Sequence, residues 1–157
     1  MGTTEFPYLK SVECPADKEA EDAMHTETFT YAQIRKSCQT FLEAVSEDQA
    51  GREFVFQDFE IKETDAAGYV KEIRIGESLY SGEKFRQALG LASSAFALQD
   101  YQGKLRITTT GNGHGFGMSE WTANWEAKEG KQYKDILGIF FEGCEVIKDN
   151  EIFSKLE

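Results

Sequence analysis

The stretch Gly111-Asn112-Gly113-His114-Gly115-Phe116-Gly117-Met118-Ser119-Glu120-Trp121 decides how this chain is interpreted. Glycine occupies every second position from 111 to 117, and helix-forming sequence follows directly. Repeated glycine is typical of a backbone that turns sharply or lets a ligand approach closely. We therefore expect a strand, a tight corner and a helix that begins near Ser119, with a functional site at the corner.

The glycine run does not fit the common nucleotide-binding motifs. A G-x-G-x-x-G motif would need glycine at position 116 or 118, where Phe116 and Met118 stand. No Lys-Ser or Lys-Thr pair follows, so a phosphate-binding loop is excluded as well. His114 can donate, accept or titrate near neutral pH. It either faces a ligand or only pins the corner by bonding a neighbouring carbonyl.

Several residues after the glycines, and one upstream of them, each have one structural and one functional interpretation. Ser119 can cap the helix, and a cap can also contact a ligand. Glu120 is either a first-turn acid that suits the helix dipole or part of the site. Trp121 and Trp125 share a helix face and are either core residues or a platform for a sugar. Arg86 forms a surface ion pair or braces the cleft.

Hydrophobic periodicity outward from the run predicts an α+β fold with an antiparallel or mixed sheet, built from strand pairs with flanking helices. Residues 1–27 read as irregular, with a solvated acidic loop at 17–22. The expected strands are 54–61 with 69–75, 94–98 with 105–110, and a short one at 144–147. The expected helices are 31–45, capped by Thr28 or Thr30, then 83–89, 119–128 and 133–141, with the last two separated at Gly130.

Chain length and net charge limit the functions that are possible. The 157 residues suit a single domain spanning 1–157, and 40% hydrophobic content can build a core. The net charge of −11 makes nucleic acid and anionic membrane surfaces unsuitable partners. No apolar run is long enough to cross a bilayer, and no signal peptide opens the chain. We expect an excised segment or an internal start.

The cysteines and histidines give weak support for a metal site. Cys14, Cys38 and Cys144 form no C-x-x-C pair and allow at most one disulfide, and Cys38 reads as a small buried hydrophobic residue. Zinc could be held by Cys14, His25, Cys38 and His114, but their spacing does not favour it. His25 reads as solvated in the acidic loop. We expect no metal and no other cofactor.

The chain resembles the stage II sporulation protein D family. That family's pattern G-x-G-H-G-V-G-M-S-Q-[YW]-G-A matches the run, and its R-x-x-L-G-L-x-S-x-x-F and P-Y-L-x-x-V-x-x-P segments match upstream. The similarity spans Pro7 to Val146 and is carried by these groups of residues: Gly113 to Trp121, Ala123, Ala127, Gly130, Tyr133, Ile136-Leu137, Phe140-Phe141, Phe85-Arg86, Leu89-Gly90-Leu91, Ser94, Phe96, Pro7-Tyr8-Leu9, Val12 and Pro15.

The resemblance implies cell-wall chemistry. Family members resemble lytic transglycosylases, in which one glutamate protonates the glycosidic oxygen of peptidoglycan and then takes a proton from the sugar's 6-hydroxyl. That glutamate lies in an E-M-P segment that does not occur here, so this chain looks like the C-terminal part of the catalytic domain within a larger fold. Its own catalytic residue stays unknown. Glu120 and Thr122 replace the family's usual Gln and Gly.

Two functions from different classes stay open. The chain is part of a peptidoglycan lytic transglycosylase active in sporulation, with its acid supplied by a missing segment, another chain or Glu120. Alternatively it is a non-catalytic cell-wall binding or amidase-enhancer module; a metal-dependent hydrolase is a weaker third interpretation. The expected substrate-binding residues are Thr110, Asn112, His114, Ser119, Glu120, Trp121 and Arg86.

The resemblance also implies partners and a location. We expect contact with peptidoglycan glycan strands and with an N-terminal half or another cell-wall hydrolase. We expect no nucleic acid, no membrane contact from this segment, and an extracytoplasmic location. An isolated half of a fold exposes apolar surface, so self-association into a homo-oligomer is a further expectation.

Overall fold

The computed structural model describes residues 8, 10–40, 42 and 52–147. The chain divides into two units, which are treated separately below. Unit 2 is the continuous segment Glu19–Gly115, and unit 1 combines Met1–Lys18 with Phe116–Glu157. The boundary therefore falls inside the glycine run, between Gly115 and Phe116. The expectation of a single domain stays a prediction.

Unit 2 contains a first antiparallel sheet, in the order β1-β6-β5. Its strands are β1 (Met24–Phe29), β5 (Phe96–Tyr101) and β6 (Lys104–Thr110). β5 and β6 form the expected hairpin, which turns at Gln102 and Gly103, both with positive φ. Strand β1 was not expected from the sequence. Its residues MHTETF are mostly polar, and it gains its hydrogen bonds from β6.

A second antiparallel sheet has the order β2-β3-β4. Its strands are β2 (Phe59–Thr64), β3 (Val70–Ile75) and β4 (Ser78–Ser81). The prediction of a strand starting at residue 54 was wrong at its beginning, because Phe56–Asp58 is the 3₁₀ helix η2. The Asp58 carboxylate accepts the Val55 N–H at 2.8 Å and pairs with Arg52, which favours a turn there over alternation.

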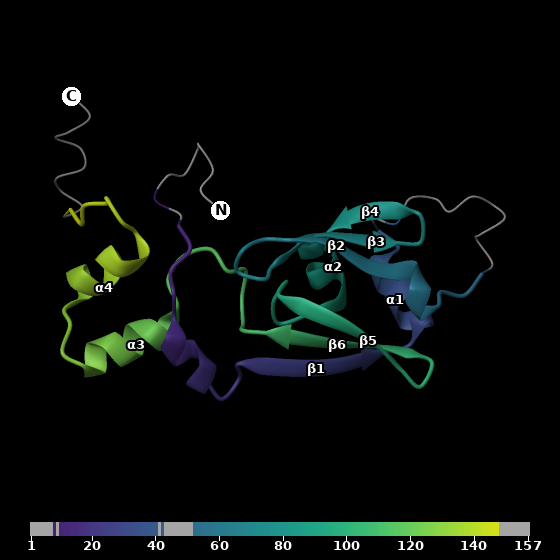
Figure 1. Cartoon of the computed structure of the whole chain (residues 1–157), viewed down its shortest axis with the longest axis horizontal. Coiled ribbons are helices and arrows are strands. Elements are labelled where there is room, and N and C mark those ends of the chain that lie inside the picture. The colour runs from purple at the N-terminus through teal and green to yellow at the C-terminus, as the bar shows by residue number, and fades with distance from the viewer. Residues whose placement is uncertain (1–7, 9, 41, 43–51, 148–157) are drawn as a thin grey trace, which may run out of the picture. The chain divides into compact units, whose positions relative to one another are not determined.

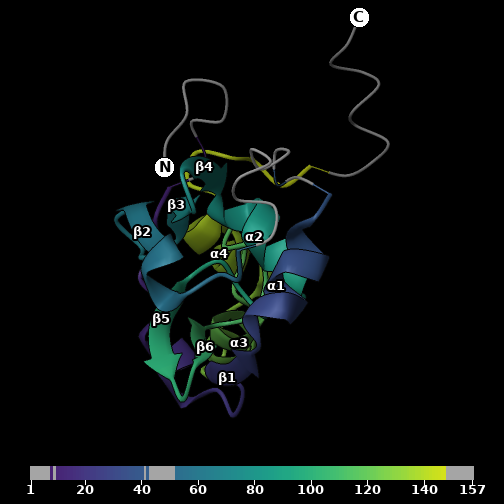
Figure 2. The same ribbon diagram turned by 90° about the vertical axis from the view of Figure 1, so that its right-hand side faces the viewer.

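Two helices belong to unit 2, and they lie next to each other in Figures 1 and 2. α1 (Tyr31–Cys38) is capped by Thr30, one of the two predicted caps, which forms a capping box with Gln33. The prediction that it continues to residue 45 was wrong at Gln39 and Thr40, which form a turn; residues 41 and 43–45 lie outside the described part. α2 (Gly82–Leu89) ends at Gly90 in the left-handed conformation.

The core of unit 2 draws on both sheets and both helices. Phe85 of α2 is fully buried and packs against Phe96 of β5, with ring centroids 5.4 Å apart. Cys38 is buried in the same cluster, so its interpretation as a small hydrophobic residue is confirmed. The remaining members come from the strands, the two helices and the segments next to them: Ile34, Phe54, Phe59, Val70, Ile73, Ile75, Leu89, Leu91, Leu105 and Ile107.

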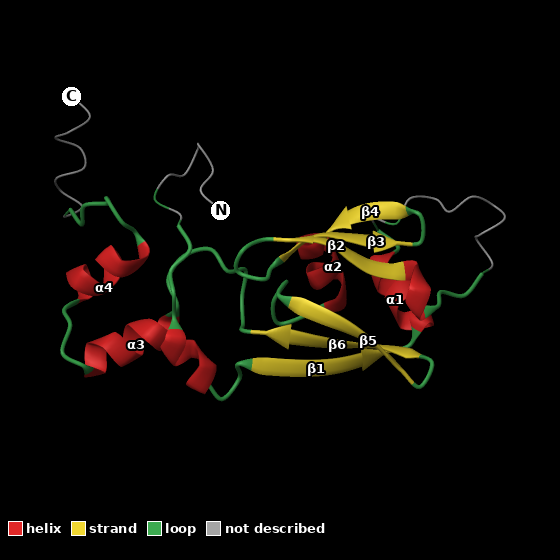
Figure 3. Ribbon diagram, in the orientation of Figure 1, coloured by secondary structure: helices red, strands yellow, loops and turns green. Residues whose placement is uncertain are grey.

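Unit 1 contains α3 (Glu120–Lys128) and α4 (Tyr133–Phe140), with Gly130 at φ +93° between them (Figure 3). The short 3₁₀ helix η1 (Pro15–Glu19) lies at the boundary between the units. The prediction of a strand at 144–147 was wrong, because the described part of unit 1 offers no strand with which it could pair. Two antiparallel sheets with four α-helices confirm the α+β class.

Candidate functional site: the glycine run and its supports

A buried serine fixes the point where β6 enters the glycine run. The Ser93 side chain is fully buried, and its hydroxyl donates to the Thr110 carbonyl at 2.6 Å. The same oxygen accepts the Ala95 N–H at 3.1 Å, while the Thr110 N–H donates to the Ala95 carbonyl at 2.8 Å. The end of β6 is therefore held by the segment that precedes β5, although the Thr110 side chain itself is exposed.

Backbone hydrogen bonds then hold the first half of the run. The Gly111 N–H donates to the Ala23 carbonyl at 2.7 Å, and the Gly113 N–H donates to the Ala92 carbonyl at 2.8 Å. Ser93 and Gly113 also form an isolated parallel bridge. The run thus lies against the residues before β1 and those before β5. These contacts order a segment whose glycines would otherwise be costly to fix.

The four alternating glycines all adopt positive φ. The values are +72° at Gly111, +102° at Gly113, +76° at Gly115 and +111° at Gly117. Other residues pay a steric cost in this region, so the pattern read from the sequence has a backbone explanation. Between these glycines the side chains of Asn112 and His114 are exposed, as is Phe116 of unit 1.

The tip of the run contacts an aromatic ring that sequence reasoning missed. A Cβ built on Gly115 would lie 2.4 Å from Cζ of Tyr69, so the ring occupies the space of a side chain at this position. Tyr69 directly precedes β3, 46 positions away in the sequence. No local motif marks it, because the contact depends on how the two segments fold together.

Ser119 begins α3 as a cap, which confirms the structural interpretation of that residue. Its hydroxyl oxygen accepts the Thr122 N–H at 3.0 Å. The hydroxyl hydrogen is donated to Asp17 Oδ1 at 2.6 Å, and Thr122 Oγ1 donates to the same oxygen, also at 2.6 Å. The interpretation of Asp17 as a solvated loop residue was wrong, because this carboxylate is bonded to both hydroxyls.

The predicted binding residues therefore fall into two groups. Unit 2 contains Thr110, Asn112, His114 and Arg86, and unit 1 contains Ser119, Glu120 and Trp121. The structure brings Ser119 and its helix neighbours together with Asp17, and it places Asn112 and His114 on one ordered loop. Glu120 and Trp121 are exposed, so Trp121 is not a core residue of the described structure. A single site that uses both groups stays a prediction.

Arg86 forms an ion pair, which is one of its two predicted roles, and its bracing of a cleft stays a prediction. Its Nε donates to Glu83 Oε2 at 3.2 Å, one helical turn earlier, and its guanidinium also donates to the Leu91 carbonyl at 3.3 Å. The side chain is 21% exposed. Arg86 thus links α2 to the start of the segment that supports the glycine run. Its direct contact with a ligand stays a prediction.

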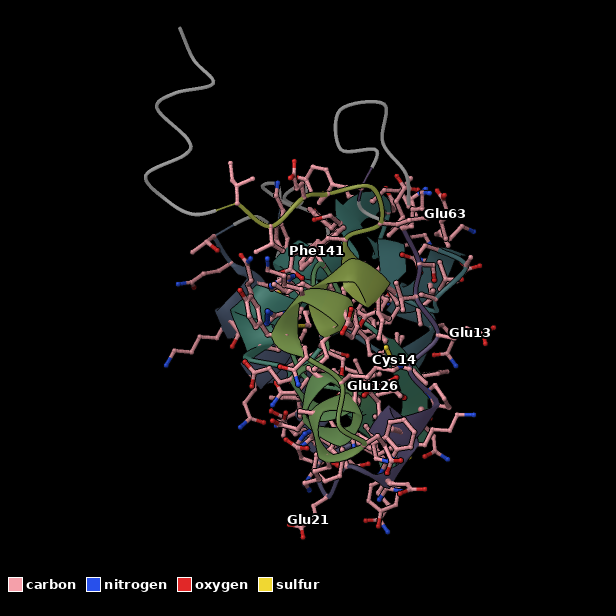
Figure 4. The ribbon with its side chains drawn as sticks, turned by 90° about the vertical axis from the view of Figure 1, so that its left-hand side faces the viewer. Glu13, Cys14, Glu21, Glu63, Glu126 and Phe141 are labelled. Carbon is pink, nitrogen blue, oxygen red and sulfur yellow. The ribbon has the colours of Figure 1, made fainter. Side chains whose placement is uncertain are left out.

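Cys14 and Cys38 lie in environments that disfavour their thiolates. Burial raises the pKa of Cys38 to about 12. Desolvation also raises the pKa of Cys14, although a hydrogen bond with the Thr122 side chain opposes the shift; Cys14 is labelled in Figure 4. All three cysteines are free. Such thiols suit packing better than nucleophilic chemistry.

Metal-ligating residues do not gather in the part of the chain that the structure describes, where no group of three or more His, Cys, Asp or Glu side chains could hold an ion. The interpretation of His25 as solvated was wrong. It lies in β1 opposite Thr109, and its Nε2 is buried with no hydrogen-bond partner among the described residues.

Within those same residues, the helices are too short or too polar to span a lipid bilayer.

Comparison with known proteins agrees with the motifs. No family model matches the chain. It is 32% identical over 153 residues to the stage II sporulation protein D of Bacillus amyloliquefaciens and to that of Bacillus subtilis. An uncharacterized protein of Brachyspira hyodysenteriae is 29% identical over 94 residues, which cover 58% of this chain and 26% of that protein. The two Bacillus alignments cover 98% of this chain but 42% of each relative.

The names of the two Bacillus relatives associate them with sporulation, and this chain corresponds to the C-terminal part of their length. Over nearly all of its own residues, this chain belongs to the stage II sporulation protein D family.

Proposed function

We propose that this chain recognises the glycan strands of peptidoglycan, as part of a lytic transglycosylase that remodels the cell wall during sporulation. The observation that supports the proposal best is the glycine run itself. A fixed backbone presents the exposed side chains of Asn112 and His114 on a narrow loop. Amide and imidazole groups can donate and accept hydrogen bonds, which suits the hydroxyl and acetamido groups of a sugar.

Glycan recognition fits the charge of the chain as well. With a net charge of −11, the surface attracts neither phosphate backbones nor anionic lipids. A peptidoglycan strand presents many neutral hydroxyl and acetamido groups beside the carboxylate of each muramic acid, and hydrogen bonds to these neutral groups need no basic patch. The names of the Bacillus relatives associate them with sporulation, which supports the proposal, and we propose an extracytoplasmic location for this chain.

Cleavage by this chain alone has weaker support, and the non-catalytic binding module is therefore the second candidate. A general acid needs a raised pKa. The carboxyl groups whose pKa shifts clearly, Glu60 and Glu142, both shift downward, because lysine side chains bond to them. We propose that the proton donor of the whole protein lies outside these 157 residues. The alternative is a donor within them, for which Glu120 is the candidate.

Binding is tested by titrating the chain with glycan strands stripped of stem peptides and measuring heat or amide chemical shifts. His114→Ala should weaken binding at least about tenfold, equivalent to about 1.4 kcal/mol. Lys104→Ala is the matched control, since this exposed residue begins β6 and the run follows the other end of the strand. Equal affinity of His114→Ala and the wild type would count against the proposal.

Cleavage is tested by mass spectrometry of the same strands for anhydro-muramyl ends. We expect binding without product from this chain. Product that disappears in Glu120→Gln would instead make Glu120 the acid and favour the enzyme over the binding module. Absence of both binding and product would contradict both candidate functions.

A further inference from the structure

Gly115 differs from its neighbours in the run by what lies beside it. A side chain at Gly111, Gly113 or Gly117 would meet nothing within 4 Å. At Gly115 the same Cβ would lie 2.4 Å from Cζ, 2.6 Å from Cε1 and 2.7 Å from the hydroxyl oxygen of Tyr69. At Gly111, Gly113 and Gly117 the positive φ alone favours glycine. At Gly115 glycine is also required because the Tyr69 ring occupies the space that a side chain would fill.

Several hydrogen bonds determine where Tyr69 lies. The Asp65 carboxylate accepts the N–H groups of Tyr69 and Ala67, both at 3.0 Å. The Asp65 N–H in turn donates to the Tyr69 carbonyl at 2.9 Å. This closes the turn between β2 and β3 around one side chain and fixes the backbone that carries the ring.

The ring and the run are also built on the same support. The Val70 N–H, next to Tyr69, donates to the Ser94 carbonyl at 2.8 Å. The neighbouring residues Ala92 and Ser93 bond to Gly113 and to the Thr110 carbonyl. Ser93 and Ser94 are both buried, so this support is shielded from water. Because one buried segment holds both the Tyr69 backbone and the glycine run, the contact between the ring and the run is part of the folded structure of unit 2.

Tyr69 is only partly buried, unlike the core aromatic residues Phe59, Phe85 and Phe96. Part of its surface therefore reaches solvent beside the loop tip, where the adjacent residue His114 is exposed. A phenol combines an apolar face with a hydroxyl that donates and accepts. That combination suits a sugar ring, which has apolar C–H faces and hydroxyl edges.

We propose that Tyr69 is a saccharide-contacting residue that acts with His114 on either side of Gly115. This inference rests on the proposed function and extends it by adding a residue from the turn between β2 and β3. The ring fixes the loop tip, and its hydroxyl and exposed face contact the glycan that His114 also contacts. Glycine is required at position 115 because any larger residue would displace the ring.

The test uses the whole chain and a hexamer of β-1,4-linked N-acetylglucosamine, with affinity read from amide chemical shifts. Tyr69→Phe keeps the ring and removes only the hydroxyl, so it should bind about 2–10-fold more weakly with an unchanged melting temperature. Tyr69→Ala removes the ring as well and should lose at least about tenfold. Tyr80→Phe is the matched control, since Tyr80 of β4 is also a half-buried tyrosine.

Gly115→Ala supplies a second variant that does not depend on the hydroxyl. It should weaken binding and shift the resonances of His114 and Tyr69 together, while Gly113→Ala, where the space is open, should leave those of Tyr69 in place. Shifts of His114 alone in Gly115→Ala would overturn the coupling of ring and loop.

The outcomes separate the two proposals. Wild-type binding that neither Tyr69 variant changes would overturn the role of Tyr69 and leave the proposed function standing. A loss of affinity in Tyr69→Phe that comes with displaced His114 resonances would reduce Tyr69 to a structural residue and overturn the contact. A wild-type chain that binds neither the hexamer nor natural glycan strands would overturn both proposals.

Discussion

The two units bury their apolar side chains to very different extents. Among the described residues, the core of unit 2 combines two sheets and two helices, whereas unit 1 buries only Ile136 and Phe140 as large apolar side chains. Unit 1 instead exposes most of its aromatic residues, with Trp121 42%, Trp125 47% and Tyr133 62% exposed. The described part of unit 2 therefore has an apolar core of its own, whereas the described part of unit 1 leaves most of its large aromatic side chains exposed.

The largest expected effect comes from removing one phenylalanine of each unit. Phe85→Ala empties a fully buried position in unit 2 and should cost about 3–5 kcal/mol. Phe140→Ala, at 3% exposure, should mainly destabilise unit 1. Urea unfolding can be followed by thiol labelling, with Cys38 reporting on unit 2 and Cys14 on unit 1. If either variant shifted both thiols equally, the units would unfold as one, and the comparison would fail.

A pair of helix glycines should give effects of opposite sign. A Cβ on Gly82 would lie 2.1 Å from the Val70 carbonyl oxygen, so Gly82→Ala must displace backbone and should cost about 1–3 kcal/mol or more. Gly138 lies inside α4 with nothing within 4 Å, so Gly138→Ala should stabilise unit 1 by about 0.5–1 kcal/mol. Melting temperatures of the two variants decide this. A destabilised Gly138→Ala would mean that α4 packs more tightly than described.

The polar contacts of unit 1 are tested at Asp17. Asp17→Ala removes the acceptor of both Ser119 and Thr122, and it leaves the buried Thr122 hydroxyl with only the Cys14 thiol as a side-chain partner, at a cost of about 1–3 kcal/mol. Glu13→Ala, an exposed acid of the same unit, is the control and should stay within about 0.5 kcal/mol. Labelling of Cys14 in urea measures the change. Equal midpoints for the two variants would argue against a stabilising role for Asp17.

The smallest effects concern exposed carboxylates and their dependence on pH. Hydrogen bonds from Lys62 and Arg74 lower the pKa of Glu60, and the bond from Lys10 lowers that of Glu142. Each contribution is therefore present near neutral pH and is lost as pH falls through the lowered pKa of the folded state. Lys10→Ala should return the pKa of Glu142 to its ordinary range.

Lys62→Ala should return the pKa of Glu60 only partly, because Arg74 stays beside it. Carboxyl titration by NMR measures both changes. Full recovery in Lys62→Ala would mean that Arg74 contributes nothing in solution.

Sequence patterns predicted elements that carry their own signals. The helix around Phe85, the β5–β6 hairpin and the α3 cap at Ser119 have local periodicity, turn residues or capping residues, and all were confirmed. The alternating glycines likewise predicted the corner after β6. Where a short window contains the physical cause of a structure, the sequence is sufficient.

The predictions were wrong where a local structure depends on contacts with distant parts of the chain. Strand β1 is polar and owes its existence to pairing with β6, and residues 144–147 alternate but find no partner strand. Asp17 and Tyr69 show the same limitation at the candidate site. Their contacts with Ser119 and Gly115 join segments that are far apart in sequence, and a single chain without aligned relatives does not reveal them.

The conformation of the glycine run also limits how evolution or an engineer can alter it. At Gly111, Gly113 and Gly117 there is room for a methyl group, yet an L-alanine would be strained at these φ values. A D-alanine introduced by chemical synthesis would fit the same backbone and reduce the entropy lost on folding. Since the ribosome supplies no mirror-image residue, translation cannot stiffen this loop from within, and its order must come from the residues around it.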